Sequence, residues 1–155
     1  MYLSPVRRSD RILATHSLAH RTFVMPAVRT ILHPTDFGPA SRAAFDDVCS
    51  LAREHSAEVI LLHVVPPNPP ADLQEMKALL EKIGSAATHP KVHPELRAGV
   101  VPAVILEVTD EIQADLVVMG THSRQGLSRL LIGSVAEEVL RHSRCPVLFV
   151  KGQLN

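Results

Sequence analysis

The sequence predicts a single α/β domain in which buried strands and helices alternate along the chain. Its 155 residues fit one domain of ordinary size. Apolar residues make up 46% and charged residues 21%, which is a globular composition. Short apolar runs alternate with segments whose apolar residues recur at helical spacing. Because Trp is absent and Tyr occurs once, the core is expected to be aliphatic.

Five short apolar runs predict the strands of a parallel sheet that is buried on both faces. The first two runs end at prolines, which cannot continue a central strand. The third run is more polar than the others. The predicted strands are residues 29–33, 58–65, 91–98, 116–119 and 146–150.

Four segments between these runs carry apolar residues on one helical face. In the first segment Phe45, Val48, Cys49 and Ala52 form this stripe. Glycine and proline mark helix starts, and glycine also marks ends. Gly38-Pro39 is expected to start the first helix, Gly84 to end the second, and Gly99 with Pro102 to start the third. The fourth helix is expected at residues 134–142.

Alternating strands and helices with right-handed crossovers predict a doubly wound fold. The simplest arrangement is a five-stranded parallel sheet in the order 3-2-1-4-5, with two helices on each face. In this order the chain changes direction between the first and fourth strands. Ligands of such folds bind at the carboxyl ends of those two strands, where the loops diverge.

The two ends of the chain differ from the domain expected at residues 29–151. Residues 1–28 hold four arginines and one aspartate, a net charge of +3, and they lack a long apolar period. We interpret them as a flexible basic arm or as a miscalled start, with Met25 as the true first residue. An Arg-rich organellar presequence is a third alternative. Residues 152–155 are expected to form a C-terminal tail.

Composition argues against several classes of partner. Sixteen basic and sixteen acidic residues leave no broad positive field for nucleic acid. No apolar run approaches the roughly 18 residues of a membrane span, so no membrane partner is expected. The two cysteines lack the spacing of a disulfide framework or a zinc site, and a reducing cytoplasm fits them best.

The histidines do not form a convincing metal site. His16 with His20 and His89 with His93 have i, i+4 spacing, but prolines oppose a helix at the second pair. His33 and His63 end strands, where we expect packed or hydrogen-bonded side chains.

The first candidate site residue is Asp36, which follows the first predicted strand. A carboxylate at this end of the sheet could accept hydrogen bonds from a ribose hydroxyl or an adenine amino group. The alternative is a local role, because aspartate at this position also caps a helix or forms an Asx-turn.

The second candidate is the loop from Gly120 to Ser134, which leaves the fourth strand and returns at a helix. Its glycines free backbone N–H groups, and the helix N-terminus attracts phosphate oxygens. Alternatively, Ser134 and Glu137 form a capping box that only starts the helix. The chain lacks a Walker A loop and a G-x-G-x-x-G fingerprint, which disfavours an ordinary kinase or dehydrogenase.

At these residues the chain resembles the universal stress protein family over about residues 28–151. The resemblance rests on RTILHPTD at 29–36, VILLHVV at 59–65, DLVVMGTHSRQGLSRLLIGSVAEEVL at 115–140 and CPVLFV at 145–150. The family's ATP-binding branch is similar to G-x2-G-x9-G-[ST]. Gly120, Ser123, Gly133 and Ser134 fall at this spacing, with serine in place of the second glycine.

The resemblance implies an ATP-binding regulatory module of the stress response that is not an enzyme. The last predicted strand presents a short apolar edge at residues 147–150, and we expect two copies to associate through it as a homodimer. Mg²⁺ is an optional companion of the ATP. The alternatives are a nucleotide-free dimeric stress or scaffolding protein and a very slow ATPase. The implied contacts are Asp36 and the backbone of Val64 with adenosine, Met119 beside the nucleotide, and Gly120, Ser123, Gly133, Ser134 and Val135 around the phosphates.

The serine at position 123 generates a test by restoration of the motif. If this position needs a positive φ, or if its Cβ crowds a phosphate, Ser123→Gly removes a penalty of about 1 kcal/mol. We expect ATP to bind about five- to tenfold more tightly, as measured by titration calorimetry. Weaker binding by the variant would instead show that the serine hydroxyl contacts the ligand.

Overall fold

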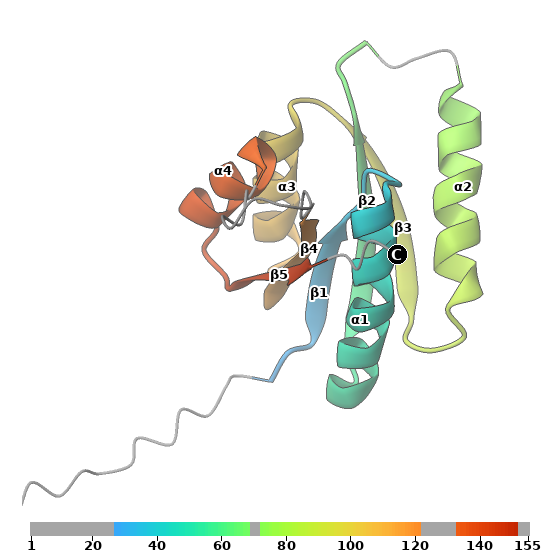
Figure 1. Ribbon diagram of the computed structural model, residues 1–155, viewed down its shortest axis with the longest axis vertical. Helices are drawn as coiled ribbons and strands as arrows, with labels where there is room; N and C mark the ends of the chain where they lie inside the picture. Colours follow the sequence, from blue (N-terminus) through green and yellow to red (C-terminus); the bar gives the residue numbers. More distant parts are fainter. Residues whose placement is uncertain (1–26, 69–71, 122–132, 152–155) are drawn as a thin grey trace, which may run out of the picture.

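The computed structural model describes residues 27–68, 72–121 and 133–151, and it shows one parallel sheet between helices (Figure 1). The five strands are ordered β3-β2-β1-β4-β5, which confirms the predicted fold class and strand order. The strands are β1 (Thr30–Pro34), β2 (Glu58–Val65), β3 (Val92–Ala98), β4 (Leu116–Thr121) and β5 (Val147–Lys151). The helices are α1 (Pro39–His55), α2 (Leu73–Ala86), α3 (Val101–Glu111) and α4 (Ser134–His142).

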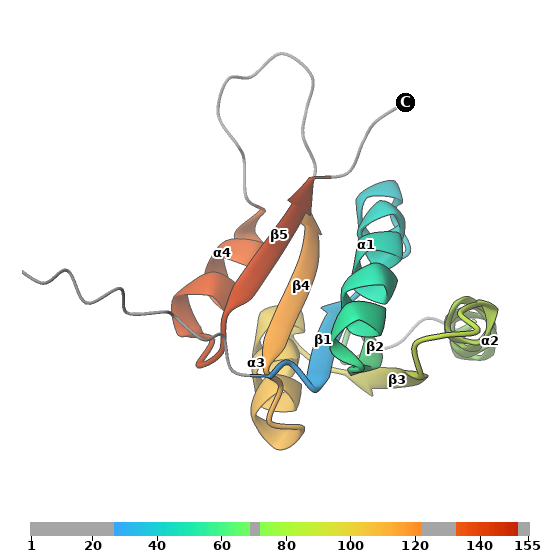
Figure 2. The same cartoon turned by 90° about the horizontal axis from the view of Figure 1, so that it is seen from below.

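Two helices cover each face of the sheet, as predicted. Figure 2 shows α1 on the face opposite to α3 and α4. The side chains of β2 alternate accordingly, because Val59 packs in the cluster that contains α1 and Leu62 packs in the cluster that contains α3. Helix α2 packs on the outer part of the α1 face, where Gly84 contacts the side chain of Val92.

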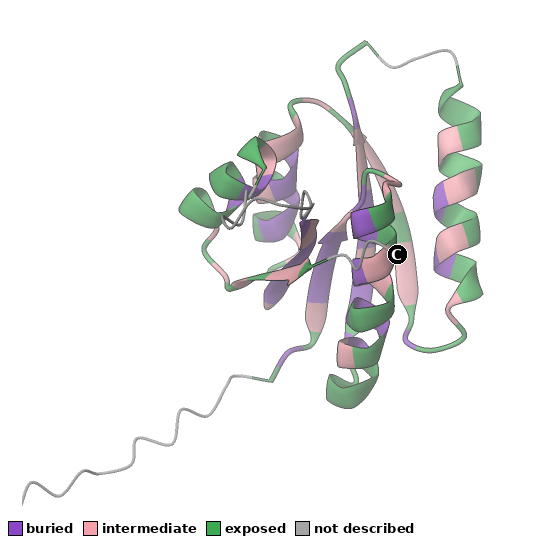
Figure 3. Cartoon of the chain, viewed as in Figure 1, coloured by how far each residue is buried: buried purple, intermediate pink, exposed green. Residues whose placement is uncertain are grey.

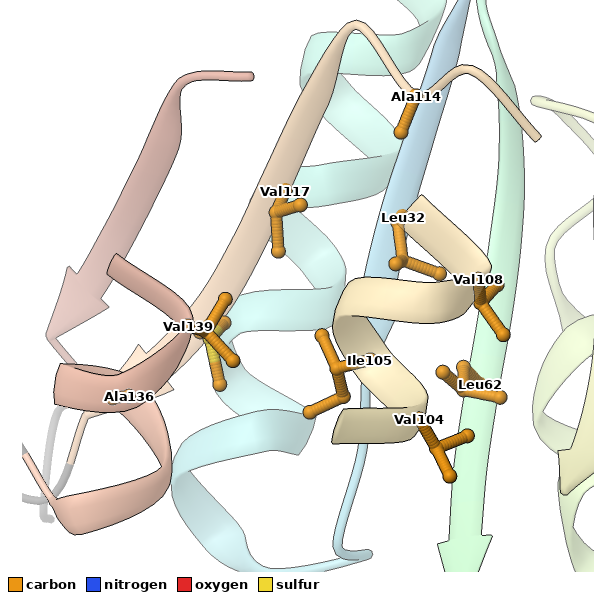
Figure 4. Close-up of a cluster of buried hydrophobic side chains, with 10 residues drawn as sticks. Leu32, Leu62, Val104, Ile105, Val108, Ala114, Val117, Ala136 and Val139 are labelled. Carbon is orange, nitrogen blue, oxygen red and sulfur yellow. The ribbon is translucent and has the colours of Figure 1, made fainter. Parts of the chain in front are cut away.

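The larger core fills the space between the sheet and the pair α3 and α4 (Figure 4). Burial of each aliphatic side chain there stabilises the fold by roughly 1.5–3 kcal/mol relative to exposure. Figure 3 shows the same pattern as buried central strands and exposed outer helix faces. This core consists of Leu32, Leu62, Val104, Ile105, Val108, Ala114, Val117, Met119, Ala136 and Val139.

A smaller core lies under α1 and contains Ile31, Val48, Val59 and Val118. Val28, which precedes β1, is buried in it as well, so packing against the domain extends at least to this residue. The rest of the predicted basic arm (residues 1–26) and the predicted tail (residues 152–155) lie outside the described residues.

The prediction that Gly84 ends the second helix is wrong, because α2 continues to Ala86. Gly84 is buried, and a Cβ at this position would lie 3.0 Å from Cγ of Pro94 in β3. The glycine therefore allows the helix to approach the strand closely. A glycine inside a helix costs about 1 kcal/mol relative to alanine, and this local cost does not stop the helix here.

Several other boundaries also differ from the prediction. Strands β1, β3 and β5 each begin one residue later than expected, and β1 includes Pro34, which pairs with Leu62. Gly99 lies outside α3, which begins at Val101 with Val100 as its N-cap and Pro102 in the first turn. Strand β4 extends past residue 119 because Gly120 and Thr121 still pair with β5.

The first turn of α1 rests directly on the backbone of β4 at Gly120. A Cβ at Gly120 would contact the carbonyl of Ala40 and would lie 2.9 Å from the backbone nitrogen of Ser41. These neighbours are backbone atoms, which cannot rotate away as a flexible side chain can. Glycine at position 120 is therefore required for the packing of α1 on β4.

This contact predicts that Gly120→Ala lowers the free energy of unfolding by about 1–3 kcal/mol, the usual cost of overpacking. Gly133→Ala is the matched control. A Cβ at Gly133 meets no described atom within 4 Å, and Gly133 has a negative φ of −60°. We expect the control to lose less than about 1 kcal/mol. Urea denaturation of both variants measures the difference, and equal losses would contradict the steric argument.

Candidate functional site

The candidate site is a cavity at the point where β1 and β4 diverge. These strands pair through Ile31 with Leu116 and Leu32 with Val117, and the pairing then stops. A cavity of about 270 Å³ opens between their carboxyl ends, as the strand order predicts. It is lined by Pro34, Thr35, Asp36, Ala40, Ser41, Leu62, His63, Val64, Val101, Ile105, Met119, Gly120, Thr121, Gly133, Val135 and Ala136.

The lining combines an apolar wall with a polar rim. Val64 from β2 together with Val101 and Ile105 from α3 contribute aliphatic surface. Asp36 and Ser41 contribute oxygen atoms from the β1–α1 connection and the first turn of α1. An apolar wall with a few fixed polar groups suits a small organic ligand that carries hydroxyl or amino groups.

Asp36 occupies the predicted position at the cavity, and it also forms the local turn that was its alternative role. Its Oδ1 accepts hydrogen bonds from the backbone nitrogen of Gly38 at 2.8 Å and from the hydroxyl of Ser41 at 2.7 Å. The residue itself remains exposed. The Asx-turn therefore fixes the direction of a carboxylate that borders the cavity.

The residues beside Asp36 are held by further contacts. Thr35 donates its backbone N–H to the carbonyl of Leu62 at 2.8 Å, and its Oγ1 accepts from the backbone nitrogen of Phe37 at 3.1 Å. Phe37 has a φ of 61°, which costs on the order of 1 kcal/mol for a residue with a side chain. This conformation places its ring 4.2 Å from the ring of His63. Nδ1 of His63 lies 2.7 Å from the carbonyl oxygen of Thr35, to which it donates.

His33 lies beneath the cavity and is completely buried. Its Nδ1 is 2.8 Å from the carbonyl oxygen of Val118 in β4, and its Nε2 is 3.1 Å from the carbonyl oxygen of Ser41 in α1. Its ring stacks with Phe45 at 5.8 Å. Burial lowers the pKa of His33, while the two carbonyl contacts and the charge of Asp36 act in the opposite direction. The expectation of a packed, hydrogen-bonded histidine is confirmed, but its place under the site was not predicted.

Helix α4 begins beside the cavity without the predicted capping box. Gly133 is the N-cap and forms no side-chain cap bond, and Ser134 is the first helical residue. Glycine is itself an accepted N-cap, and the N-cap lies one residue before the serine that the capping-box pattern indicates. Gly133 and Val135 line the cavity, and this places the N-terminus of α4 at its edge.

The structure brings most of the predicted site residues together. Six of them line the cavity: Asp36, Val64, Met119, Gly120, Gly133 and Val135. Ser134 is exposed and lies between two lining residues without lining the cavity itself. Ser123 lies outside the described residues.

Neither a metal-binding cluster nor a membrane-spanning helix occurs in the described ranges. Within residues 27–68, 72–121 and 133–151, no group of three or more His, Cys, Asp or Glu side chains is placed to hold a metal ion. None of the helices described is both long and apolar enough to cross a membrane.

Comparisons with known proteins agree with this architecture. Residues 27–151 match the model of the universal stress protein family. A universal stress protein of Methanocaldococcus jannaschii is 36% identical over 139 residues, which cover 79% of this chain and 82% of the relative. A universal stress protein of Synechocystis is 32% identical over 133 residues, which cover 79% of this chain and 85% of the relative.

Solved structures show the same fold. A universal stress protein in complex with cAMP superposes with a TM-score of 0.67 at 27% identity, over 83% of this chain and all of the other. Universal stress protein UspA from Lactobacillus plantarum gives a TM-score of 0.69 at 22% identity, over 81% of this chain and 99% of the other. The family model and the sequence relatives each cover most of the domain described above, and the chain therefore belongs to the universal stress protein family.

Proposed function

We propose that this chain binds ATP in the cavity between β1 and β4 and acts as a regulatory module of the stress response. The observation that carries the proposal is the placement of Asp36 and the N-terminus of α4 at the same cavity. A carboxylate accepts hydrogen bonds from sugar hydroxyls, and a helix N-terminus attracts phosphate. A nucleotide carries both groups.

The geometry suggests a direction for the ligand. The adenine ring packs on the apolar wall of Val64 and Ile105, beside Met119. The ribose lies toward Asp36, and the phosphates point to Gly133 and the first turn of α4. Mg²⁺ enters with the phosphates, since it prefers phosphate oxygens to sites built from protein alone.

A structural relative supports the class of ligand. The universal stress protein solved with cAMP shares the fold and 27% of the aligned residues. That ligand contains adenine, ribose and phosphate, the three parts that we place along the cavity lining. We extend the class from cAMP in that protein to ATP in this one because of the family motif at Gly120, Gly133 and Ser134.

We assign the module a regulatory role rather than a catalytic one. The buried His33 uses both ring nitrogens in contacts to carbonyl oxygens, and His63 uses Nδ1 in the same way. Both imidazoles therefore serve the structure of the site. We place the protein in the reducing cytoplasm, where Cys49 and Cys145 remain free thiols.

The test of nucleotide binding is titration calorimetry with Mg·ATP on the full chain and on Asp36→Asn. Loss of the charge weakens a hydrogen bond worth about 1.5–3 kcal/mol, so we expect roughly ten- to a hundredfold weaker binding. Asp46→Asn is the control, because Asp46 is exposed on α1 and does not line the cavity. Absence of heat at millimolar ATP with the unmodified chain would favour the nucleotide-free alternative, and phosphate release over hours would indicate a slow ATPase.

We further propose that two copies associate through β5. This strand pairs with β4 on one side, and no described strand covers its other edge. Leu148 is 43% exposed on it, whereas Phe149 packs against the larger core. Leu148 also borders a groove with Leu51 of α1. An apolar strand edge of this kind pairs readily with its own copy.

The association is tested by light scattering of Leu148→Lys at tens of micromolar protein. A buried lysine at a two-fold interface brings like charges together, so the variant should be monomeric while the unmodified chain is dimeric. Leu73→Lys is the control, because Leu73 is a similarly exposed leucine (36%) on α2. A mass of 16.9 kDa for the unmodified chain would refute the dimer.

A further inference from the structure

The buried imidazole of His33 places each of its two ring nitrogens at a carbonyl oxygen, an arrangement that packing alone does not explain. Pairing between β1 and β4 stops after Leu32 and Val117, and His33 is the next residue of β1. Its ring bridges the widening space by contacting Val118 of β4 and Ser41 of α1. It is a titratable side chain among the largest fully buried residues, which are otherwise aliphatic.

Both hydrogen-bond partners of the ring are carbonyl oxygens, and carbonyl oxygens only accept. A neutral imidazole carries one N–H, so it donates to one carbonyl while the lone pair of its other nitrogen faces the second. Only the doubly protonated ring donates to both. The contacts of 2.8 Å and 3.1 Å therefore form a site whose geometry suits two ring protons.

Burial and negative charge act on the pKa of His33 in opposite directions. Asp36, in the β1–α1 connection, is the charged group whose field acts on the ring. The elements packed against it contribute Val118 from β4, Leu61 from β2, and Ser41 and Phe45 from α1, none of which has a side chain that titrates in this pH range. Burial is the largest effect and lowers the pKa of His33 in the ligand-free protein. A bound nucleotide carries negative charge, and negative charge near the ring favours its protonated form.

We propose that His33 is a positioning residue that takes up its second ring proton as a nucleotide binds, an inference that rests on the proposed function. The proton moves from solvent to the free ring nitrogen, and no other bond changes. The ring then donates to Val118 and Ser41 at the same time.

Each of these two contacts leads to a wall of the cavity. Val118 precedes Met119 and Gly120, which line the cavity on the β4 side. Ser41 donates its hydroxyl to Asp36 at 2.7 Å on the α1 side. A ring that holds both carbonyls therefore sets the separation of the β4 wall and the carboxylate across the diverging strands.

The sign of the pH dependence follows from proton uptake. A nucleotide that prefers the protonated ring raises the pKa of His33, so affinity rises as pH falls from the pKa of the complex toward that of the free protein. Burial places the latter below the ordinary value of 6.5. The gain is at most about tenfold per pH unit for one proton.

The experiment measures ATP affinity by calorimetry between about pH 5.5 and 8 for the unmodified chain, His33→Gln and His63→Gln. Glutamine supplies an amide donor that does not titrate. Free ATP titrates identically in every sample, so its own protonation cancels from the affinity ratio of two proteins. We expect the affinity ratio of the unmodified chain to His33→Gln to rise severalfold toward acid pH. The affinity ratio of His63→Gln to His33→Gln should rise in the same way.

A ratio that stays constant with pH, or a rise lost only in His63→Gln, would overturn the inference while leaving ATP binding intact. Absence of ATP heat at every pH would refute the proposed function itself. Nitrogen NMR of the imidazole rings in the unmodified chain, with and without ATP, gives a reading that does not depend on a variant. His33 should show the imidazolium pattern in the complex at a pH where the free protein shows a neutral ring, and a neutral ring in both would refute proton uptake.

Discussion

The divergence of β1 and β4 is the constraint on which the rest of this structure depends. Crossovers run outward from β1 in both directions, so the strands at the centre of the sheet send their chains to opposite faces. The two strands pair through Leu32 and Val117 and then separate. The separation leaves polar backbone between two layers of helix, and side chains from several elements must satisfy it. The side chains of His33, Thr35 and Ser41 contact backbone groups of Val118, Phe37 and Gly38, and Thr35 and Ser41 also line the cavity.

The same residues serve the fold and the site, so local and functional roles do not exclude one another here. Asp36 closes a turn through Gly38 and still presents its carboxylate at the cavity. Gly120 admits the backbone of α1 and also lines the cavity. A structural role for one of these residues is therefore no argument against a functional role. The divergence of β1 and β4 brings the packing contacts and the atoms that line the cavity to one place.

Periodicity and proline positions were sufficient for most of the fold, since β2 and α4 have the predicted bounds and the strand order follows from alternation. Prediction from local sequence failed where a contact with a distant residue determines the role of a side chain. Gly84 lies inside α2, where it packs closely against Pro94 of β3, and a local sequence pattern does not reveal this contact. The role of His33 depends on Val118, 85 residues away, and on Ser41. The N-cap was misplaced because glycine and serine are adjacent at 133 and 134 and both serve as N-caps.

Two glycines that line the cavity, Gly120 and Gly133, have unequal surroundings among the described residues. On the α1 side, Gly120 and Ala40 are in backbone contact, and neither element can shift without moving the other. On the α4 side, no described atom lies within 4 Å of a Cβ built at Gly133. Under the proposed function, a nucleotide would meet this fixed surface on the α1 side and would extend its phosphates toward α4. Tolerance for phosphate chains of different length would then lie on the α4 side.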